Sequence, residues 1–109
     1  MKHTKNNVTL IGKLGTDPVF RRFENGQRLA KMQLATNETK RYLDGQNEKL
    51  TRWHQLVAWG NTADIIKHML NKGRHVAIEG KLNNRSWKDK NGKLHNASEI
   101  IIKNFTILN

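Results

Sequence analysis

The chain has 109 residues, with 20 Lys and Arg against 9 Asp and Glu, so its formal net charge is +11 at pH 7. This length allows one domain with one modest core, and the absence of cysteine excludes disulfides and thiolate metal sites. The charge favours a polyanionic partner, namely DNA, RNA or an anionic membrane surface, with a merely soluble basic surface as the alternative. No apolar run approaches the ~20 residues that a membrane-spanning helix needs, so a cytoplasmic protein is expected.

The first half of the chain is predicted to form strands joined by turns. β-branched and aliphatic residues favour a strand over 8–14, in which Gly12 indicates a bend or bulge. The Asn-Gly pair at 25–26 predicts a two-residue type I′ hairpin, because both central residues of that turn need positive φ. A second strand follows over 28–36, where apolar and polar residues alternate. The polar stretch 37–49 is predicted to be a long, basic hairpin loop.

The second half holds the one convincing helix. It follows the third predicted strand, residues 51–60, and Asn61 can cap it while Gly73 can close it. Between these ends lies an apolar stripe at helical spacing, made by Ile65, Ile66, Met69 and Leu70. Two further strands are predicted at 75–82 and 95–102, separated by a second Asn-Gly hairpin.

The order of these elements indicates the fold class. Short strands joined by hairpins, with one helix between the third and the fourth strand, match the five-stranded OB-fold barrel of the all-β class. An SH3-like barrel usually lacks that helix, and a sandwich usually needs more strands. We therefore expect residues 1–109 to form a single OB-fold domain.

Two of the three tryptophans lie in the stretch TRWHQLVAWG, and their placement is ambiguous. Residues two apart on a strand share a face, so Trp53 and Trp59 point the same way. The opposite face carries His54, Leu56 and Ala58, of which the last two suit a tight barrel interior. Exposed tryptophans would then form a stacking platform for unpaired bases, worth about 1–3 kcal/mol per base. From the spacing alone, burial in the core or in a subunit interface is an equally good interpretation.

The third tryptophan, Trp87, lies among charged residues next to the second Asn-Gly turn, whereas a core tryptophan usually has apolar neighbours. Cations beside an aromatic ring provide phosphate contacts next to a base-stacking surface. Other cations are spread over several elements, as expected of a surface that follows a nucleic-acid backbone. The whole set is Lys13, Arg21, Arg22, Lys31, Lys40, Arg41, Lys72, Arg74, Arg85, Lys88 and Lys90.

No pattern in the chain indicates catalysis. The five histidines lack metal-ligand spacing, the nine acids are scattered singly, and phosphate-binding glycine motifs and nucleophile motifs are missing. The chain is therefore not expected to be an enzyme or to hold a metal or cofactor, and a nuclease is the enzymatic alternative.

Motifs in a fixed order make the chain resemble the bacterial single-stranded DNA-binding protein (SSB) family. The likeness covers almost the whole chain, so it is more specific than any single motif. The matching pieces are Asn7-Val8, LIGKLGTDP (10–18), ENG (24–26), LAT (34–36), WHQLVAWG (53–60), LNKG (70–73), IEGKL (78–82), Arg85 with Trp87, and ASEIII (97–102).

The resemblance implies an OB-fold protomer that forms a homotetramer and wraps single-stranded DNA without sequence preference in replication, recombination and repair. It implies a cytoplasmic, nucleoid-associated protein with bases stacked on Trp53, Trp59 and Trp87, where Trp59 stands at a position that is commonly phenylalanine. The family places the histidine that matches His54 at the subunit interface. The cations expected to contact phosphates are Lys13, Arg21, Lys31, Lys72, Arg85 and Lys88.

Two departures from the family pattern bear on the surface and on the partners. Many members carry another stacking aromatic where this chain has Lys40. We expect Tyr42, which has the same strand parity, to supply that ring, or Lys40 to replace it with a phosphate contact. Members also usually continue into a flexible tail with an acidic tip that recruits replication and repair proteins, and no such tail follows Leu108-Asn109. Those partners are expected only if an acidic tail exists beyond this chain.

Two other functions stay open at this point. The first is a basic OB interaction module of a primosome or mobile-element replication complex, which would act mainly through protein partners. The second is an RNA-binding OB domain, which has less support because cold-shock-type aromatic motifs are missing.

Overall fold

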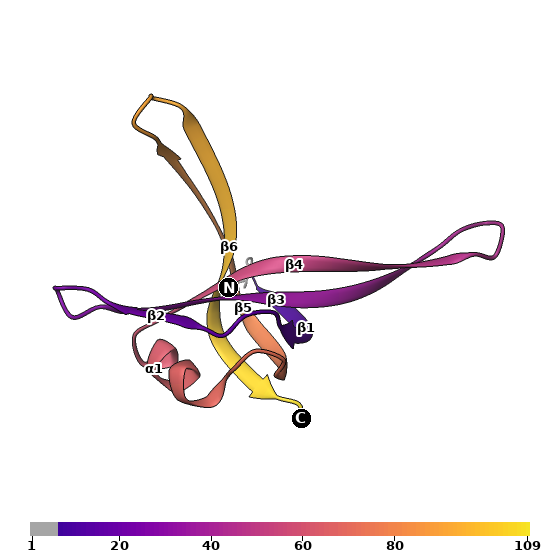
Figure 1. Ribbon diagram of the computed structural model, residues 1–109, viewed down its shortest axis with the longest axis horizontal. Helices are drawn as coiled ribbons and strands as arrows, with labels where there is room; N and C mark the ends of the chain where they lie inside the picture. The colour runs from indigo at the N-terminus through magenta and orange to yellow at the C-terminus, as the bar shows by residue number, and fades with distance from the viewer. Residues whose placement is uncertain (1–6) are drawn as a thin grey trace, which may run out of the picture.

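The computed structural model describes residues 7–109, and most of them lie in strands (Figure 1). The elements in chain order are β1 (Val8–Leu14), β2 (Val19–Arg22), β3 (Arg28–Arg41), β4 (Asn47–Trp59), α1 (Gly60–Met69), β5 (His75–Lys88) and β6 (Leu94–Ile107). The sheet order is β1-β5-β6-β4-β3-β2, and a further β1–β3 pairing closes five of these strands into a barrel. The predicted five-stranded OB-fold is therefore confirmed. The short edge strand β2 was not counted in the prediction, so the helix lies between β4 and β5.

The barrel closes through two short contacts between strands. β1 meets β3 at the pairs Lys13↔Ala35 and Leu14↔Leu34, and β4 runs parallel to β6 beside residues 100–101. At the first of these closures Gly12 lies so close to β3 that an added Cβ would be 2.1 Å from the carbonyl oxygen of Ala35. The glycine is therefore needed for a close backbone approach, which is one of the two uses expected of a glycine inside a strand.

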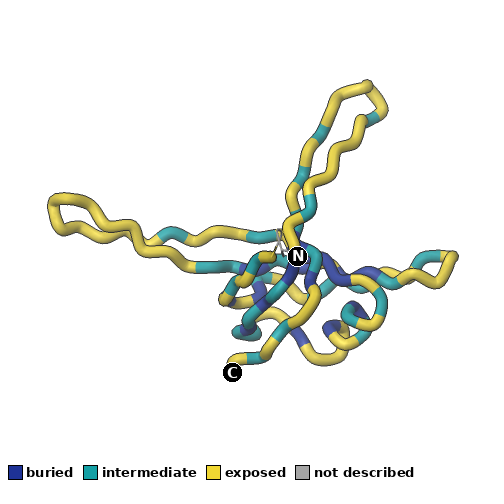
Figure 2. Tube along the Cα trace, turned by 180° about the vertical axis from the view of Figure 1, so that it is seen from behind, coloured by how far each residue is buried: buried dark blue, intermediate teal, exposed yellow. Residues whose placement is uncertain are grey.

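The core occupies the inside of the barrel and the face of α1 that covers its lower end in Figure 1. Leu56 and Ala58 on β4 are buried, as strand parity predicted. From the helix the core receives Ala63 and Ile66, and Leu70 follows directly after it. Figure 2 shows that burial is concentrated in the barrel, whereas the outer parts of the three hairpins are exposed.

The helix is shorter than predicted and its ends differ. It begins at Gly60, directly after Trp59, and ends at Met69, with no side-chain hydrogen bond capping its first turn. Asn61 does not cap it, because its side-chain oxygen accepts a hydrogen bond from Arg28 at 3.2 Å. Only half of the predicted apolar stripe is buried, since Ile65 and Met69 are each 48% exposed.

The stretch 37–49 is not a loop, and this prediction was wrong. β3 and β4 stay paired from Leu29↔Trp59 out to Arg41↔Asn47, so they form a long ribbon that leaves the barrel. Polar residues suit such a ribbon because both of its faces meet water and its backbone groups pair with each other. Cross-strand contacts support it, including the Arg52–Glu38 ion pair at 2.9 Å.

The predicted type I′ turn was also wrong. The N–H of Phe23 donates to the carbonyl of Gln27 at 2.8 Å, and the N–H of Gly26 donates back to Phe23 at 2.9 Å. These bonds enclose three residues, of which only the glycine has positive φ, so the turn is a type I turn followed by a glycine bulge. The same arrangement recurs at residues 42–46 and 89–93.

Candidate nucleic-acid interface

Trp53 and Trp59 lie on the outer face of the barrel. Trp53 is 57% exposed and Trp59 is 43% exposed, while Val57 between them is buried. The equal choice left by the sequence, between core and surface, is thus decided for the single protomer in favour of surface.

Trp87 lies on the same face of the sheet, although it is far away in the chain. Val57 pairs with Ile101 across β4 and β6, and Ile101 pairs with Lys81 across β6 and β5. Steps of two residues preserve the face, and the β5–β6 register is regular from Lys81 to Trp87. The three tryptophans therefore share one continuous outer surface, which twists with the β5–β6 ribbon.

The ring of Trp53 packs against the turn after β1. A Cβ built at Gly15 would lie 2.1 Å from Cζ3 and 2.8 Å from Cη2 of this indole. Gly15 is itself fixed, because its N–H donates to the carbonyl of Gln33 at 2.9 Å. A side chain at this position would therefore push the ring away from the barrel.

The ring of Trp59 is supported by the β2–β3 hairpin. It stacks on Phe23, with ring centroids 6.2 Å apart and planes inclined by 22°. The guanidinium of Arg21 lies 4.8 Å from the centroid of the same phenylalanine. A bidentate pair between Arg28 and Asp64, with nitrogen–oxygen distances of 2.8 and 2.9 Å, ties this hairpin to the helix. Sequence reasoning missed Phe23, although the two-residue spacing from Arg21 was a usable signal.

The ring of Trp87 lies in a small cluster near the end of the β5–β6 ribbon. His95, its cross-strand partner, stacks on it at 5.4 Å with an interplanar angle of 19°. The guanidinium carbon of Arg85 lies 5.2 Å from the centroid of the indole. Asp89 binds the imidazole at 2.8 Å, and hydrogen bonds from His95 and from the backbone of Lys93 hold the pKa of this carboxyl below its usual value. His95 was also missed by sequence reasoning.

Two of the predicted cations form rows with the tryptophans across the barrel. Lys13 pairs with Ala35, which pairs with Trp53. Arg21 pairs with Leu29, which pairs with Trp59. Residues paired across antiparallel strands lie on the same face, so each tryptophan has a cation two strands away.

The remaining predicted cations divide between this surface and other places. Lys31 pairs with Val57 and is on the outer face, and Arg85 shares the face of Trp87. Lys88 follows Trp87 directly and therefore points to the opposite face of the ribbon. Lys72 follows the helix, and its N–H donates to Asp17 at 2.7 Å. Lys81 is exposed on the outer face and was not among the predicted binding residues.

Lys40 and Tyr42 form a separate group at the far end of the β3–β4 ribbon. Lys40 pairs with Glu48 and lies five residues from Ala35, so it points to the ribbon face opposite to Trp53. Its ammonium is 5.8 Å from the ring centroid of Tyr42, whose hydroxyl donates to Glu48. That hydrogen bond, with a smaller effect of burial, raises the pKa of the Tyr42 hydroxyl above its usual value.

His54 is half-buried, and its Nε2 is 3.0 Å from the hydroxyl oxygen of Thr36. It points to the inner side of β4, as strand parity predicted, and its place at a subunit interface stays a prediction. Within residues 7–109 no three His, Asp or Glu side chains gather in a way that would hold a metal ion. His3 lies outside the described residues.

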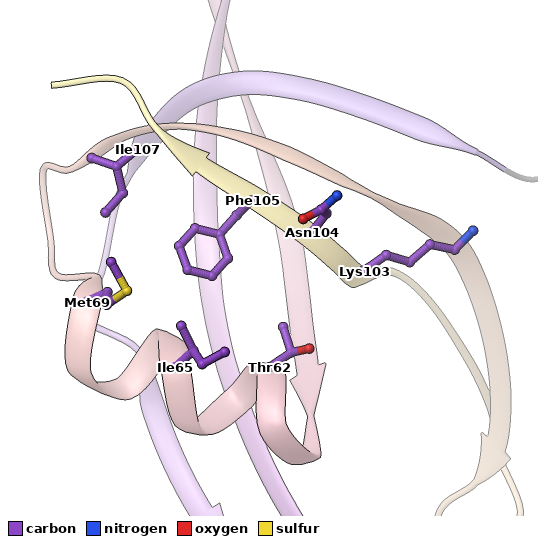
Figure 3. A pocket seen from close by; sticks show the side chains of 7 residues that line it. All are labelled: Thr62, Ile65, Met69, Lys103, Asn104, Phe105 and Ile107. Atoms are coloured by element: carbon purple, nitrogen blue, oxygen red, sulfur yellow. The ribbon is translucent and has the colours of Figure 1, made fainter.

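The most apolar hollow is on another side of the molecule. It has a volume of about 390 Å³ and lies between α1 and the end of β6 (Figure 3). Its lining contains none of the predicted binding residues, and consists of Thr62, Ile65, Met69, Lys103, Asn104, Phe105 and Ile107. Among the described residues, none forms a helix long and apolar enough to cross a membrane.

The barrel and its exposed tryptophan surface place the chain in the class of OB-fold proteins whose outer face suits single-stranded nucleic acid. The chain belongs to the single-strand binding protein family, whose model matches residues 5–108. Membership in this family of non-catalytic proteins confirms the expectation that the chain is not an enzyme.

Individual relatives agree with this assignment. Over 104 residues the chain is 44% identical to the single-stranded DNA-binding protein 1 of Chlorobaculum tepidum, a match that covers 94% of this chain and 64% of the relative. A Plasmodium falciparum SSB solved in complex with single-stranded DNA has a TM-score of 0.88 at 30% identity and covers 100% of this chain and 99% of its own. A deletion mutant of the single-stranded DNA-binding protein from Thermus aquaticus has a TM-score of 0.86 at 25% identity, covering 96% of this chain and 51% of its own.

Proposed function

We propose that this chain binds single-stranded DNA without sequence preference, by stacking bases on Trp53, Trp59 and Trp87. The observation that carries the proposal is the position of all three tryptophans, each at least 43% exposed, on one outer face of the barrel. Stacking tolerates any base, because every base has a π-face. The solved complex of the Plasmodium relative with single-stranded DNA supports this choice of ligand.

Cations near the rings neutralise the phosphates between the stacked bases. Lys13, Lys31 and Arg21 lie on the outer face of the barrel, and Arg85 lies beside Trp87. Neutralising a phosphate on a single strand releases counterions, so the logarithm of the affinity falls with the logarithm of the salt concentration, with a slope of about −0.7 per phosphate. Lys72 and Lys88, which lie off this face, are the weakest of the proposed phosphate contacts.

The protein works as a homotetramer in this proposal and protects single strands during replication, recombination and repair. The inner position of His54 and its contact with Thr36 at 3.0 Å support a role at the edge of a subunit interface. The molar mass in solution tests the assembly directly. Four times the protomer mass is expected, and a monomer at binding concentrations would refute the tetramer.

The binding experiment is a titration of labelled oligo-dT of increasing length, with the molar mass of the protein measured in the same buffer. Affinity should rise with length until the oligonucleotide spans the surface, and then level off. Failure to bind any length at low salt would refute the proposal and favour the basic OB interaction module. The half-exposed apolar hollow between α1 and β6 is the feature that such a module would use. Clean cleavage of single strands with a divalent metal ion would instead indicate a nuclease.

A further inference from the structure

We propose that His95 is a positioning residue for DNA binding, which holds the indole of Trp87 in the orientation that accepts a base, with Asp89 as its anchor. The inference rests on the proposed role of Trp87 in stacking. It concerns the end of the β5–β6 ribbon, where no barrel core is present to fix a side chain (Figure 2).

The two rings form a preassembled stack. Trp87 and His95 are cross-strand partners, so their side chains leave the same face of the ribbon side by side. Their centroids are 5.4 Å apart and their planes are inclined by only 19°. This is the offset-stacked arrangement that aromatic pairs favour, and it covers one face of the indole.

Asp89 holds the imidazole at its edge. One carboxylate oxygen lies 2.8 Å from Nε2 of His95. The other accepts hydrogen bonds from the backbone N–H groups of Asn91 and Lys93, both at 2.9 Å. The carboxylate is therefore fixed by the turn, and through it the imidazole is fixed against Trp87.

An indole held in this way has a single productive way to bind a base. With His95 on one face, the incoming base must displace the guanidinium of Arg85, whose carbon lies 5.2 Å from the ring centroid. The released guanidinium is then free to pair with a phosphate of the same strand. Because the indole is already ordered, less side-chain freedom is lost on binding than for an unsupported ring.

The test uses a protein with one reporter ring. The chain has three tryptophans, so the double variant Trp53→Phe and Trp59→Phe leaves Trp87 as the only one and keeps a ring at both other positions. His95→Ala is then compared with His95→Phe in this parent, with oligo-dT as the probe. We expect His95→Ala to weaken binding roughly threefold to tenfold and to lower the fluorescence anisotropy of Trp87 in the free protein. His95→Phe restores the stack and should bind within twofold of the parent.

A matched control separates positioning from ribbon stability. Ser86 and Asn96 form the neighbouring cross-strand pair on the opposite face, and their side chains are joined by a hydrogen bond of 2.6 Å. Asn96→Ala removes this contact and should leave both affinity and anisotropy unchanged. An equal loss of affinity in Asn96→Ala would overturn the inference.

Two further outcomes would also overturn it. One is full affinity and full quenching in His95→Ala, and the other is a His95→Phe variant as weak as His95→Ala. A failure of the proposed function looks different. In that case the emission of Trp87 in the parent does not respond to saturating oligo-dT, and the role of Trp87 and the inference about His95 fall together.

Discussion

Gly15 and Trp53 are matched to each other, because the indole ring occupies the space that any side chain at position 15 would need. A Cβ there would lie 2.1 Å from ring atom Cζ3, and its nearest neighbours are all atoms of this ring. The far end of an exposed ring can swing away at little cost, so Gly15→Ala should fold normally. It should weaken binding of oligo-dT about threefold or more, because Trp53 is displaced from the outer face.

A double-mutant cycle tests this pairing. If Gly15 acts through the ring, Gly15→Ala should have no further effect on affinity in a Trp53→Ala background, because the group that it displaces is gone. Fully additive effects of the two substitutions would contradict the proposed link between them.

Phe23→Ala should weaken DNA binding without touching a proposed DNA contact. Phe23 supports the ring of Trp59 at 6.2 Å, and such aromatic pairs contribute about 0.5–1.5 kcal/mol beyond area burial. We expect affinity for oligo-dT to fall roughly twofold to tenfold, with Phe23→Tyr close to the wild type. Equal affinities for Phe23→Ala and Phe23→Tyr would show that the stack does not support binding.

Gly12→Ala should destabilise the barrel itself. Its Cβ would lie 2.1 Å from a backbone oxygen of Ala35, and backbone at a barrel closure cannot move aside as the ring of Trp53 can. Overpacking of this kind costs about 1–3 kcal/mol or more in free energy of unfolding. Chemical denaturation measures the cost, and an unchanged midpoint would mean that β1 and β3 are further apart than described.

Tyr42 should titrate at higher pH in the native protein than in the unfolded chain, because its hydroxyl donates to Glu48. The pKa is raised in the folded state, so the linked stability is present below the ordinary value of 10.0 and is lost as the pH rises through the native value. Tyr42 is the only tyrosine, so tyrosinate absorbance reports it alone.

Glu48→Gln is the control for this titration. Removing the carboxylate should bring the native pKa of Tyr42 down toward the ordinary value. Native curves that coincide for the wild type and Glu48→Gln would contradict the hydrogen bond.

Strand parity and motif order carried most of the fold. They predicted the barrel, its helix, the buried positions of Leu56 and Ala58, and a common face for Trp53 and Trp59. They failed where backbone pairing alone decides the structure, as in the β3–β4 ribbon, which has no buried stripe to reveal it. The Asn-Gly turns failed for a related reason, since a third loop residue lets glycine alone take the positive φ.

The support for the rings was beyond sequence reasoning. The stack of Phe23 on Trp59 and that of His95 on Trp87 both depend on which residues meet across strands. Register is set by loop length and by the whole barrel, so a single strand's pattern does not contain it. Lys88 shows the converse, because it neighbours Trp87 in sequence yet lies on the other face.

The most direct test of the central claim is the tryptophan emission of the wild-type protein during titration with oligo-dT, while the anisotropy of the labelled DNA reports binding independently. Stacking on three exposed indoles predicts strong quenching that saturates together with binding. Saturated binding with unchanged emission would contradict the account, because the strand would then be held without contact to the tryptophan face.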